Sequence, residues 1–269
     1  MKIFGIFGDP IEHSLSSAMQ NAAFRALGLD ACYFPFRITK ERLEDAILGA
    51  SAMGFGGLNL TIPLKEKALE IVIPDDLAEA IGAVNTVSFG EDIVGHNTDG
   101  LGAMKALEEA RVKIKGSRAL LIGAGGAARA IAYTLAKEGA EISIANRNPG
   151  KALELAGFIQ GEGYGLEDLE RLVPQADVII NATSVGMMEG DPRLFDGNLL
   201  HIGQVVFDIV YNRETEMLKD AVKIGAVAID GVMMLVYQGA KALEIWTGLK
   251  PPIDVMEKAV REELKARER

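Results

Sequence analysis

Lys65 is the residue best placed by its type and context to exchange a proton. It closes the segment Asn59-Leu60-Thr61-Ile62-Pro63-Leu64-Lys65, which runs from a predicted strand into a predicted helix. Pro63 suits the first position of that helix, and Lys65 falls in its first turn. The positive end of a helix disfavours an ammonium, so a lysine held there by a carboxylate can accept a proton near neutral pH. The alternative is a pair of solvated lysines, Lys65 and Lys67.

A second segment supplies a carboxylate. Asp99 lies in Gly95-His96-Asn97-Thr98-Asp99-Gly100, which precedes another predicted helix. It could hold Lys65 in place, but sequence spacing does not show that the two residues meet. A plain N-cap role for Asp99 or its neighbour fits the same spacing. Asn85, in an otherwise apolar predicted strand, and Gln238, in a predicted helix, are polar residues whose roles are equally open.

Serine hydroxyls cluster before the first predicted helix. The segment His13-Ser14-Leu15-Ser16-Ser17 lies between a strand and an amphipathic helix that ends at Gly28. Either Ser16 caps this helix, or Ser17 forms a capping box with Gln20. In both cases at least one other hydroxyl stays near the helix N-terminus, where a small carboxylate is favoured.

A glycine-rich turn indicates a dinucleotide site. The predicted strand Ala119-Leu120-Leu121-Ile122 runs into Gly123-Ala124-Gly125-Gly126-Ala127-Ala128 and then into a helix. This is the G-x-G-x-x-A pattern in its required strand–turn–helix context. Gly123 permits the tight turn, Gly125 lets the backbone approach a pyrophosphate, and Ala128 allows close helix packing. A glycine-rich turn that binds nothing is the alternative.

The residues after the next predicted strand favour NADP over NAD. An NAD site usually has an Asp or Glu here to accept hydrogen bonds from the ribose 2′-hydroxyl. This chain has Asn146-Arg147-Asn148 instead. A guanidinium can bind a 2′-phosphate through charge-assisted hydrogen bonds, which a carboxylate would repel. The alternative is that Arg147 is a solvated charge in the turn before Pro149.

Composition and charge exclude several classes of protein. The 269 residues are 49% apolar and 25% charged, which is typical of an ordinary globular protein rather than a disordered one. The formal charge of −10 disfavours nucleic acid and anionic membranes as partners. Cys32, as the single cysteine, and three scattered histidines give no metal-ligand spacing, so no metal is expected. A reducing, cytoplasmic setting fits best.

No membrane or targeting segment is expected. The apolar run in MKIFGIFGDP stops at Asp9, too early for a signal peptide. The most apolar stretch, residues 119–136, is interrupted by Gly and Arg and cannot supply the roughly 18 apolar residues of a membrane helix. The sequence leaves the oligomeric state open, with a homodimer as one possibility.

The elements that position these residues alternate as in an α/β protein. Short apolar runs alternate with amphipathic segments, as expected for a mainly parallel sheet. Helices are predicted at residues 17–27, 42–53, 64–71, 99–113, 127–138, 231–246 and 253–269, and strands at residues 2–7, 31–37, 57–62, 84–89, 118–122, 141–145, 178–181 and 205–210. The second βα series, which begins at Arg118, indicates a second domain.

Taken together, these segments resemble the shikimate dehydrogenase family over essentially the whole chain. The resemblance rests on Phe7-Gly8-Asp9-Pro10-Ile11, the serine segment, the segments ending at Lys65 and Gly100, the glycine turn and Asn146-Arg147. It also includes Gly82-Ala83-Val84-Asn85-Thr86, Asn181-Ala182-Thr183-Ser184-Val185-Gly186-Met187 and Gln238.

The resemblance implies an NADPH-linked reduction of 3-dehydroshikimate to shikimate, in aromatic amino acid biosynthesis. It implies an α/β substrate-binding domain at residues 1–100, completed by 238–269, and a Rossmann-type NADP-binding domain with a parallel sheet at 101–237. Lys65 and Asp99 become the catalytic pair. The substrate carboxylate is then bound by Ser14 and Ser16, and the rest of the substrate by Asn59, Thr61, Asn85, Asp99, Tyr211 and Gln238. The residues expected to bind NADP are Gly123, Ala124, Gly125, Gly126, Ala127, Asn146, Arg147, Asn148, Thr183, Ser184 and Gly231.

Several residues depart from the family pattern. Asn148 replaces the usual Thr or Ser, which concerns one contact to the 2′-phosphate, and Arg213 stands where Pro is common after Tyr211. Ser17 and Gln20 replace Pro and His at positions expected to be scaffold. A quinate/shikimate dehydrogenase that uses NAD or both cofactors is the alternative enzyme. An NADP-sensing protein without turnover is the alternative of another class, and it would need no proton-transfer group at Lys65.

Overall fold

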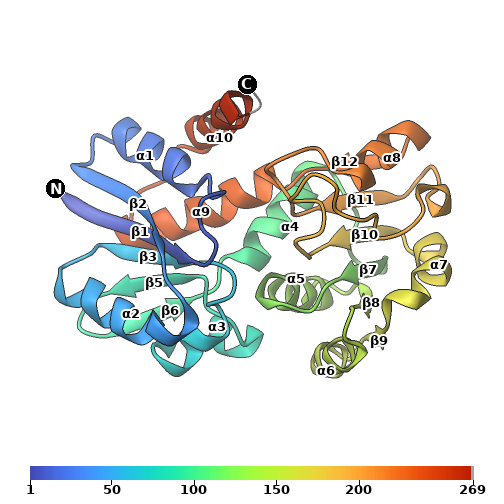
Figure 1. Ribbon diagram of the computed structural model, residues 1–269, viewed down its shortest axis with the longest axis horizontal. Coiled ribbons are helices and arrows are strands. Elements are labelled where there is room, and N and C mark those ends of the chain that lie inside the picture. The colour runs from blue at the N-terminus through green and yellow to red at the C-terminus, as the bar shows by residue number, and fades with distance from the viewer. Residues whose placement is uncertain (268–269) are drawn as a thin grey trace. The chain divides into compact units, whose positions relative to one another are not determined.

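In the computed structural model, which describes residues 1–267, the chain divides into two units. The first unit combines Met1–Gly102 with Leu235–Arg269, and the second is the continuous segment Ala103–Met234. The chain passes from the first unit to the second within helix α4 (Asp99–Glu109) and returns within α9 (Val232–Thr247). Each unit contains a sheet of its own (Figure 1).

The sheet of the first unit is mixed. Its six strands lie in the order β2-β1-β3-β5-β6-β4. Strand β1 pairs in parallel with β2 and β3, whereas β5 is antiparallel to both β3 and β6. The strand bounds are β1 (Lys2–Gly8), β2 (Ala31–Arg37), β3 (Gly57–Leu60), β4 (Ile73–Pro74), β5 (Thr86–Phe89) and β6 (Ile93–His96).

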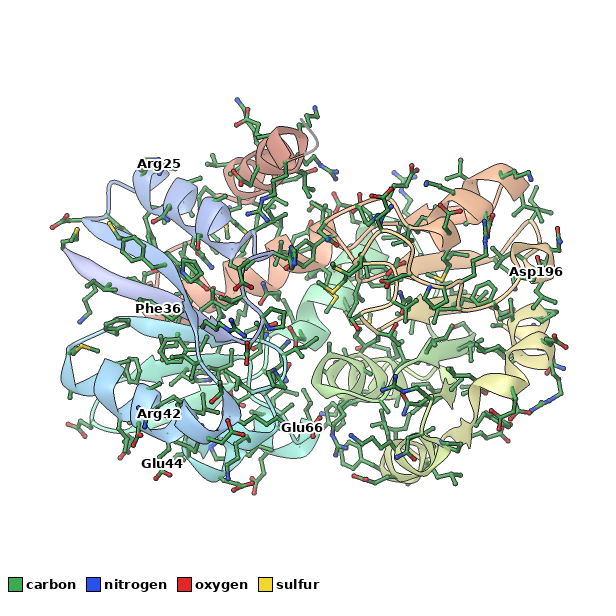
Figure 2. The ribbon with its side chains drawn as sticks, viewed as in Figure 1. Arg25, Phe36, Arg42, Glu44, Glu66 and Asp196 are labelled. Atoms are coloured by element: carbon green, nitrogen blue, oxygen red, sulfur yellow. The ribbon has the colours of Figure 1, made fainter. Side chains whose placement is uncertain are left out.

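Helices cover this sheet on both faces. Side chains alternate across each strand, so Phe7 packs into a core with α2 (Leu43–Ala52), whereas Phe4 packs on aromatic rings from α1 (Ser16–Ala26) and α9. The C-terminal helix α10 (Ile253–Arg267) packs beside α1 (Figure 1). Charged side chains such as Arg25 and Glu44 lie on the surface of this unit (Figure 2). The remaining helix is α3 (Asp76–Ile81).

The sheet of the second unit is parallel throughout. Its order β12-β11-β10-β7-β8-β9, followed from β9 to β12, is the 3-2-1-4-5-6 order of the dinucleotide-binding Rossmann fold. The order reverses between β7 and β10, where ligands of this fold bind. The strands are β7 (Arg118–Ile122), β8 (Glu141–Ala145), β9 (Glu162–Tyr164), β10 (Val178–Asn181), β11 (Val205–Asp208) and β12 (Val227–Ile229).

Two cores flank the second sheet. Ala119 and Leu121 of β7 pack with α4, α5 (Gly126–Lys137) and α6 (Pro149–Ile159). Leu120 and Ile122 face the other side, where α7 (Leu169–Leu172) and α8 (Glu216–Ile224) supply the packing partners. The strands are therefore apolar on both faces, as expected for a buried parallel sheet.

One predicted helix is wrong. Instead of a helix over residues 64–71, the structure has a 3-10 turn at Lys67–Glu70. Leu64, Ala68 and Val72 are buried in the core beside α2. Ala68 N donates to Leu64 O and Val72 N to Ala68 O, but these helix-like bonds do not extend into a continuous helix.

Several short elements were not predicted. Strands β4, β9 and β12 have only two or three residues, too few for a clear hydrophobic period, and β6 has only two apolar residues before Gly95 and His96. Helix α6 has Asn148 as its N-cap and a proline at its start, and α8 is capped by Thr215 and ends at the left-handed Gly225. These capping residues are sequence signals that could have revealed both helices. Predicted residues 268–269 of the last helix lie outside the described chain.

Candidate functional site

Lys65 and Asp99 form a largely buried ion pair in the first unit. Lys65 Nζ lies 2.6 Å from Asp99 Oδ2, and the two side chains are 14% and 5% exposed. No α-helix begins at Pro63, so the argument from a positive helix end does not apply to Lys65. The turn is instead fixed by the backbone, because Val84 N donates to Lys65 O and buried Leu64 N donates to Thr61 O.

Asp99 is the first residue of α4, but its carboxylate does not cap that helix. Its Oδ1 accepts a hydrogen bond of 2.8 Å from Asn85 Nδ2, and its Oδ2 faces Lys65. The adjacent Asn97 bridges the turn, since its Oδ1 accepts from Asp99 N and its Nδ2 donates to Ala83 O. The plain N-cap interpretation of Asp99 is therefore wrong.

Asn59, Asn85 and Gln238 extend this pair into a polar network. Asn85 Nδ2 also donates to Thr98 Oγ1 and, at 3.4 Å, to Gln238 Oε1. Asn59 Nδ2 donates to Asn85 O and Thr86 Oγ1. Asn85 lies immediately before β5 rather than inside a strand. Residues far apart in the sequence thus meet around one carboxylate.

Ser14 and Ser16 lie at the start of α1. The N-cap position is taken by Leu15, which has no side-chain cap, and both predicted capping schemes are wrong. Ser14 Oγ accepts from Ser16 N at 3.2 Å. Gln20 Nε2 donates to Gly239 O in α9 rather than capping the helix. Among residues 1–267, no hydrogen bond joins these serines or the half-buried Thr61 side chain to the network around Asp99.

The glycine turn in the second unit has the geometry of a phosphate-binding loop. Gly123 has φ +118°, and an added Cβ would lie 2.8 Å from Ala182 O, so the position requires glycine. Gly125 is the N-cap of α5 and is exposed, and an added Cβ would meet no protein atom within 4 Å. Packing within the protein therefore does not require glycine at this position, and the open space leaves room for close approach by a ligand.

Asn146, Arg147 and Asn148 follow β8, as predicted. Arg147 is exposed and forms no ion pair within the described residues. Asn148 is the N-cap of α6, with Oδ1 accepting from Gly150 N, and Asn146 Nδ2 donates to Asn148 O. Arg147 thus has a guanidinium available to bind an anion, while its two neighbours shape the turn.

A buried carboxylate that the sequence did not single out organises the loop after β10. Asn181 Oδ1 accepts from Thr183 N and Oγ1, and Asn181 Nδ2 donates to Asp208 Oδ1. Asp208, at the end of β11, also accepts from Val210 N and Thr215 Oγ1. Burial raises the pKa of Asp208 to about 6, although these three hydrogen bonds act in the opposite direction. An aspartate inside the apolar run VVFDIV was the available sequence signal.

The other predicted residues of the second unit lie near these loops in the sequence. Ser184 is exposed beside Thr183, and Tyr211 is half-buried after β11. Gly231 has no room for a side chain, because an added Cβ would lie 2.3 Å from Ile209 O.

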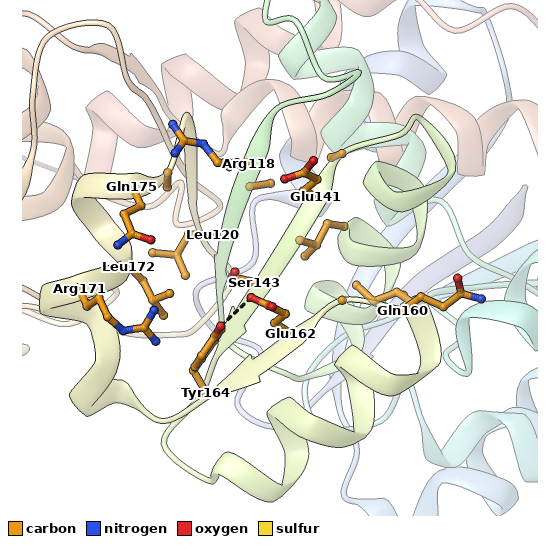
Figure 3. A pocket seen from close by; sticks show the side chains of 16 residues that line it. Arg118, Leu120, Glu141, Ser143, Gln160, Glu162, Tyr164, Arg171, Leu172 and Gln175 are labelled. Atoms are coloured by element: carbon orange, nitrogen blue, oxygen red, sulfur yellow. Dashed lines mark hydrogen bonds between the residues drawn. The ribbon is translucent and has the colours of Figure 1, made fainter.

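A separate cavity of about 420 Å³ lies at the opposite, amino-terminal end of strands β7 to β9 (Figure 3). Tyr164 and Glu162 are hydrogen-bonded in it, beside Arg171 and Gln175. The glycine turn and Arg147 do not line this cavity, so it is not the predicted dinucleotide site. Within residues 1–267, no cluster of three or more His, Cys, Asp or Glu could hold a metal ion, and no helix is long and apolar enough to span a membrane.

Comparison with known proteins identifies the family. Models described as shikimate dehydrogenase substrate binding domain, shikimate / quinate 5-dehydrogenase and shikimate 5'-dehydrogenase C-terminal domain match residues 6–87, 105–227 and 231–261. A curated relative from Methanothrix thermoacetophila, named shikimate dehydrogenase (NADP(+)), is 63% identical over 261 residues, which cover 97% of each chain. The chain belongs to the shikimate dehydrogenase family. The resemblance drawn from the sequence is confirmed.

Solved structures of shikimate dehydrogenases share the fold. The enzyme from Aquifex aeolicus matches with a TM-score of 0.93 and 40% identity, over 97% of this chain and 98% of that one. A structure from Thermus thermophilus, described as a complex with NADP(H) and shikimate, matches with a TM-score of 0.90 and 37% identity, over 97% and 99% of the two chains. The predicted α/β class with a Rossmann-type parallel sheet is confirmed.

Proposed function

We propose that the chain catalyses the reversible reduction of 3-dehydroshikimate to shikimate with NADPH, in aromatic amino acid biosynthesis. The observation that carries this proposal is the number of Lys65 N–H donors that the protein itself uses. The ammonium has three N–H donors, and within the described chain one of them is used, by Asp99. Two donors therefore remain in a largely buried position, where they can bond a substrate oxygen.

Lys65 and Asp99 form the proposed catalytic pair. In the reductive direction Lys65 Nζ donates a proton to the ketone oxygen, and in the oxidative direction it takes that proton back. Asp99 holds the lysine at 2.6 Å and can accept a hydrogen bond from the neighbouring ring hydroxyl. NADPH, when bound, supplies the hydride that reduces the ketone carbon.

The remaining polar residues of the first unit are proposed to bind the substrate. Ser14 and Ser16 suit its carboxylate, because their hydroxyls lie at the N-terminal end of α1. Asn59, Thr61, Asn85 and Gln238 are assigned to ring hydroxyls. The 3.4 Å bond between Asn85 and Gln238 is long for a hydrogen bond, so a hydroxyl can replace it at small cost. Tyr211, in the second unit, is proposed as a further substrate contact.

The second unit fits NADP. The open space at Gly125 and the N-terminus of α5 suit a pyrophosphate, and Arg147, which forms no ion pair among the described residues, suits a 2′-phosphate. Gly123, Ala124, Gly126, Ala127, Asn146, Asn148, Thr183, Ser184 and Gly231 complete the proposed cofactor site. We accordingly assign substrate binding to residues 1–100 with 238–269, and NADP binding to residues 101–237.

We further propose that the enzyme is cytoplasmic, a setting that fits a chain with a single cysteine, Cys32. A homodimer is the assembly that we propose to test. Light scattering on the purified protein distinguishes a mass of twice 28.8 kDa from that of the monomer.

The decisive experiment measures initial rates with shikimate or quinate, each with NADP or NAD. We expect the highest kcat/KM with shikimate and NADP. Comparable rates with quinate or NAD would indicate the broader enzyme instead. Saturable NADP binding without turnover on any of these substrates would overturn the enzymatic proposal and favour a sensor. The Lys65→Met variant is the control for contaminating activity from the expression host.

A further inference from the structure

A buried tyrosine is hydrogen-bonded to the polar network around Asp99. Tyr33, on β2, is fully buried, and its hydroxyl donates to Asn59 Oδ1 at 2.7 Å. Its ring packs against Trp246, with centroids 6.2 Å apart. The hydroxyl therefore does not face solvent, and it is hydrogen-bonded to the side chain of Asn59.

The hydrogen bonds continue from Tyr33 in one direction. Asn59 Nδ2 donates to Thr86 Oγ1 at 3.1 Å, and Thr86 Oγ1 donates to Asn85 Oδ1 at 3.0 Å. Asn85 Nδ2 then donates to Asp99 Oδ1 at 2.8 Å. From Asn59 to Asn85, each side chain accepts from the one before and donates to the next, so the bonds run in one direction from the Tyr33 phenol to the carboxylate of the proposed catalytic pair.

This direction is fixed at two points. A flipped Asn85 amide would place its oxygen against the Asp99 carboxylate and its NH2 group against Thr98 N–H, which now donates to Asn85 Oδ1. A flipped Asn59 amide would place its oxygen against Asn85 O. Both flips bring like partial charges together, and hydrogen bonds aligned in one direction polarise and strengthen one another.

We propose that Tyr33 and Thr86 are positioning residues for the reaction: they fix the orientation of the Asn59 and Asn85 amides and thereby align the Asp99 carboxylate with Lys65. This inference rests on the proposed function. Neither residue needs to touch the substrate, because Thr86 acts through Asn85, and Tyr33 acts through Asn59 and Thr86.

The kinetic test separates this role from a packing role. Thr86→Val keeps the shape and removes the hydroxyl, whereas Thr86→Ser keeps the hydroxyl and removes a buried methyl group. We expect Thr86→Val to lower kcat/KM for shikimate about three- to tenfold, the effect of one lost hydrogen bond, and Thr86→Ser to stay within about twofold of wild type. The two variants should not rank in thermal stability as they rank in kcat/KM, because Thr86→Ser also loses a buried methyl group and is destabilised by it. Activity that follows stability would overturn the proposal.

Tyr33→Phe tests the distant end of the chain of bonds. It keeps the ring against Trp246, and we expect a loss in kcat/KM for shikimate similar to that of Thr86→Val, with KM for NADP unchanged. The double variant should lose little more than the worse single variant, because both interrupt one series of bonds. Tyr164→Phe removes a phenol bonded to Glu162 in the other unit and is the matched control. Full additivity, or an unchanged Tyr33→Phe enzyme, would refute the positioning role.

A measurement without turnover keeps this inference distinct from the proposed function. In protein labelled with ¹⁵N-asparagine, the side-chain NH2 resonances of Asn59 and Asn85 can be followed directly. We expect Tyr33→Phe to shift the Asn85 signals although no bond joins Asn85 to Tyr33, and Tyr164→Phe to leave them in place. Unchanged Asn85 signals would refute transmission through the network. Failure of the wild type to oxidise shikimate would instead refute the proposed function.

Discussion

Replacing the buried Asp208 by asparagine should make the second unit less sensitive to pH. Asp208 is 0% exposed, and burial is the largest influence on its carboxyl group, whose pKa it raises to about 6. In an unfolded chain the pKa is about 4. The folded protein thus binds this proton more tightly than the unfolded one.

The sign follows from proton binding. Below pH 4 the Asp208 carboxyl group is protonated in both the folded and the unfolded protein, and its stabilising contribution to folding is fully present. That contribution is lost as the pH rises through 6, because the unfolded protein releases the proton first. A change in pKa from about 4 to about 6 corresponds to about 3 kcal/mol, or roughly a hundredfold in the opening equilibrium. Asp208→Asn keeps the acceptor oxygen for Asn181 and Val210. Its new NH2 group can donate to the Thr215 hydroxyl, whose rotor can reverse.

Hydrogen exchange, followed by mass spectrometry on peptides that contain β10 and β11, measures the free energy of opening around Asp208. After correction for intrinsic exchange, the free energy of opening in Asp208→Asn should rise by about 3 kcal/mol relative to wild type between pH 4 and pH 7. Asp196→Asn, which alters an exposed carboxylate in the same unit (Figure 2), is the control and should follow wild type. Parallel curves for Asp208→Asn and wild type would refute the assigned pKa.

The remaining predictions concern the proposed site. Arg147→Ala should weaken NADP binding about ten- to hundredfold and leave NAD nearly unaffected, as isothermal titration can measure, and equal losses would contradict a 2′-phosphate contact. Ser14→Ala should raise KM for shikimate with little change in kcat, because a carboxylate remote from the reacting carbon is held alike in ground and transition states, and a change in kcat alone would exclude this role. Lys65→Met should lower kcat about 10²- to 10⁴-fold, and combining it with Asp99→Asn should cost less than the product of the single effects. Near-normal kcat or independent effects would remove the pair from the mechanism.

The second unit could be predicted closely from local sequence. Strands 118–122, 141–145 and 178–181 are observed at their predicted bounds. Each is a largely apolar run in a βα series, and the glycine turn between the first of them and its helix has a fixed geometry. The short edge strands β9 and β12 lack such a period and could not be recognised.

The candidate active site could be predicted as a set of residues but not as an arrangement. Lys65 and Asp99 are 34 positions apart, and no local rule brings them together. Pro63 and Lys65 suit the first turn of a helix, but they wrongly predict a helix at residues 64–71, where the structure forms a 3-10 turn and two separate helix-like hydrogen bonds. Tyr33 gave no sequence signal, since a tyrosine in an apolar strand is ordinarily read as core.

The return of the C-terminal segment to the first unit has a consequence for synthesis of the protein on the ribosome. Residues 103–234 are continuous and can complete their own sheet as soon as they emerge, whereas the first unit waits for its final segment. Until α9 is made, Phe4 lacks the Trp246 ring and Gln20 lacks its partner at Gly239. The unit whose translation begins first is therefore the last to be completed, and a nascent chain that ends before residue 235 leaves that aromatic face open to chaperones.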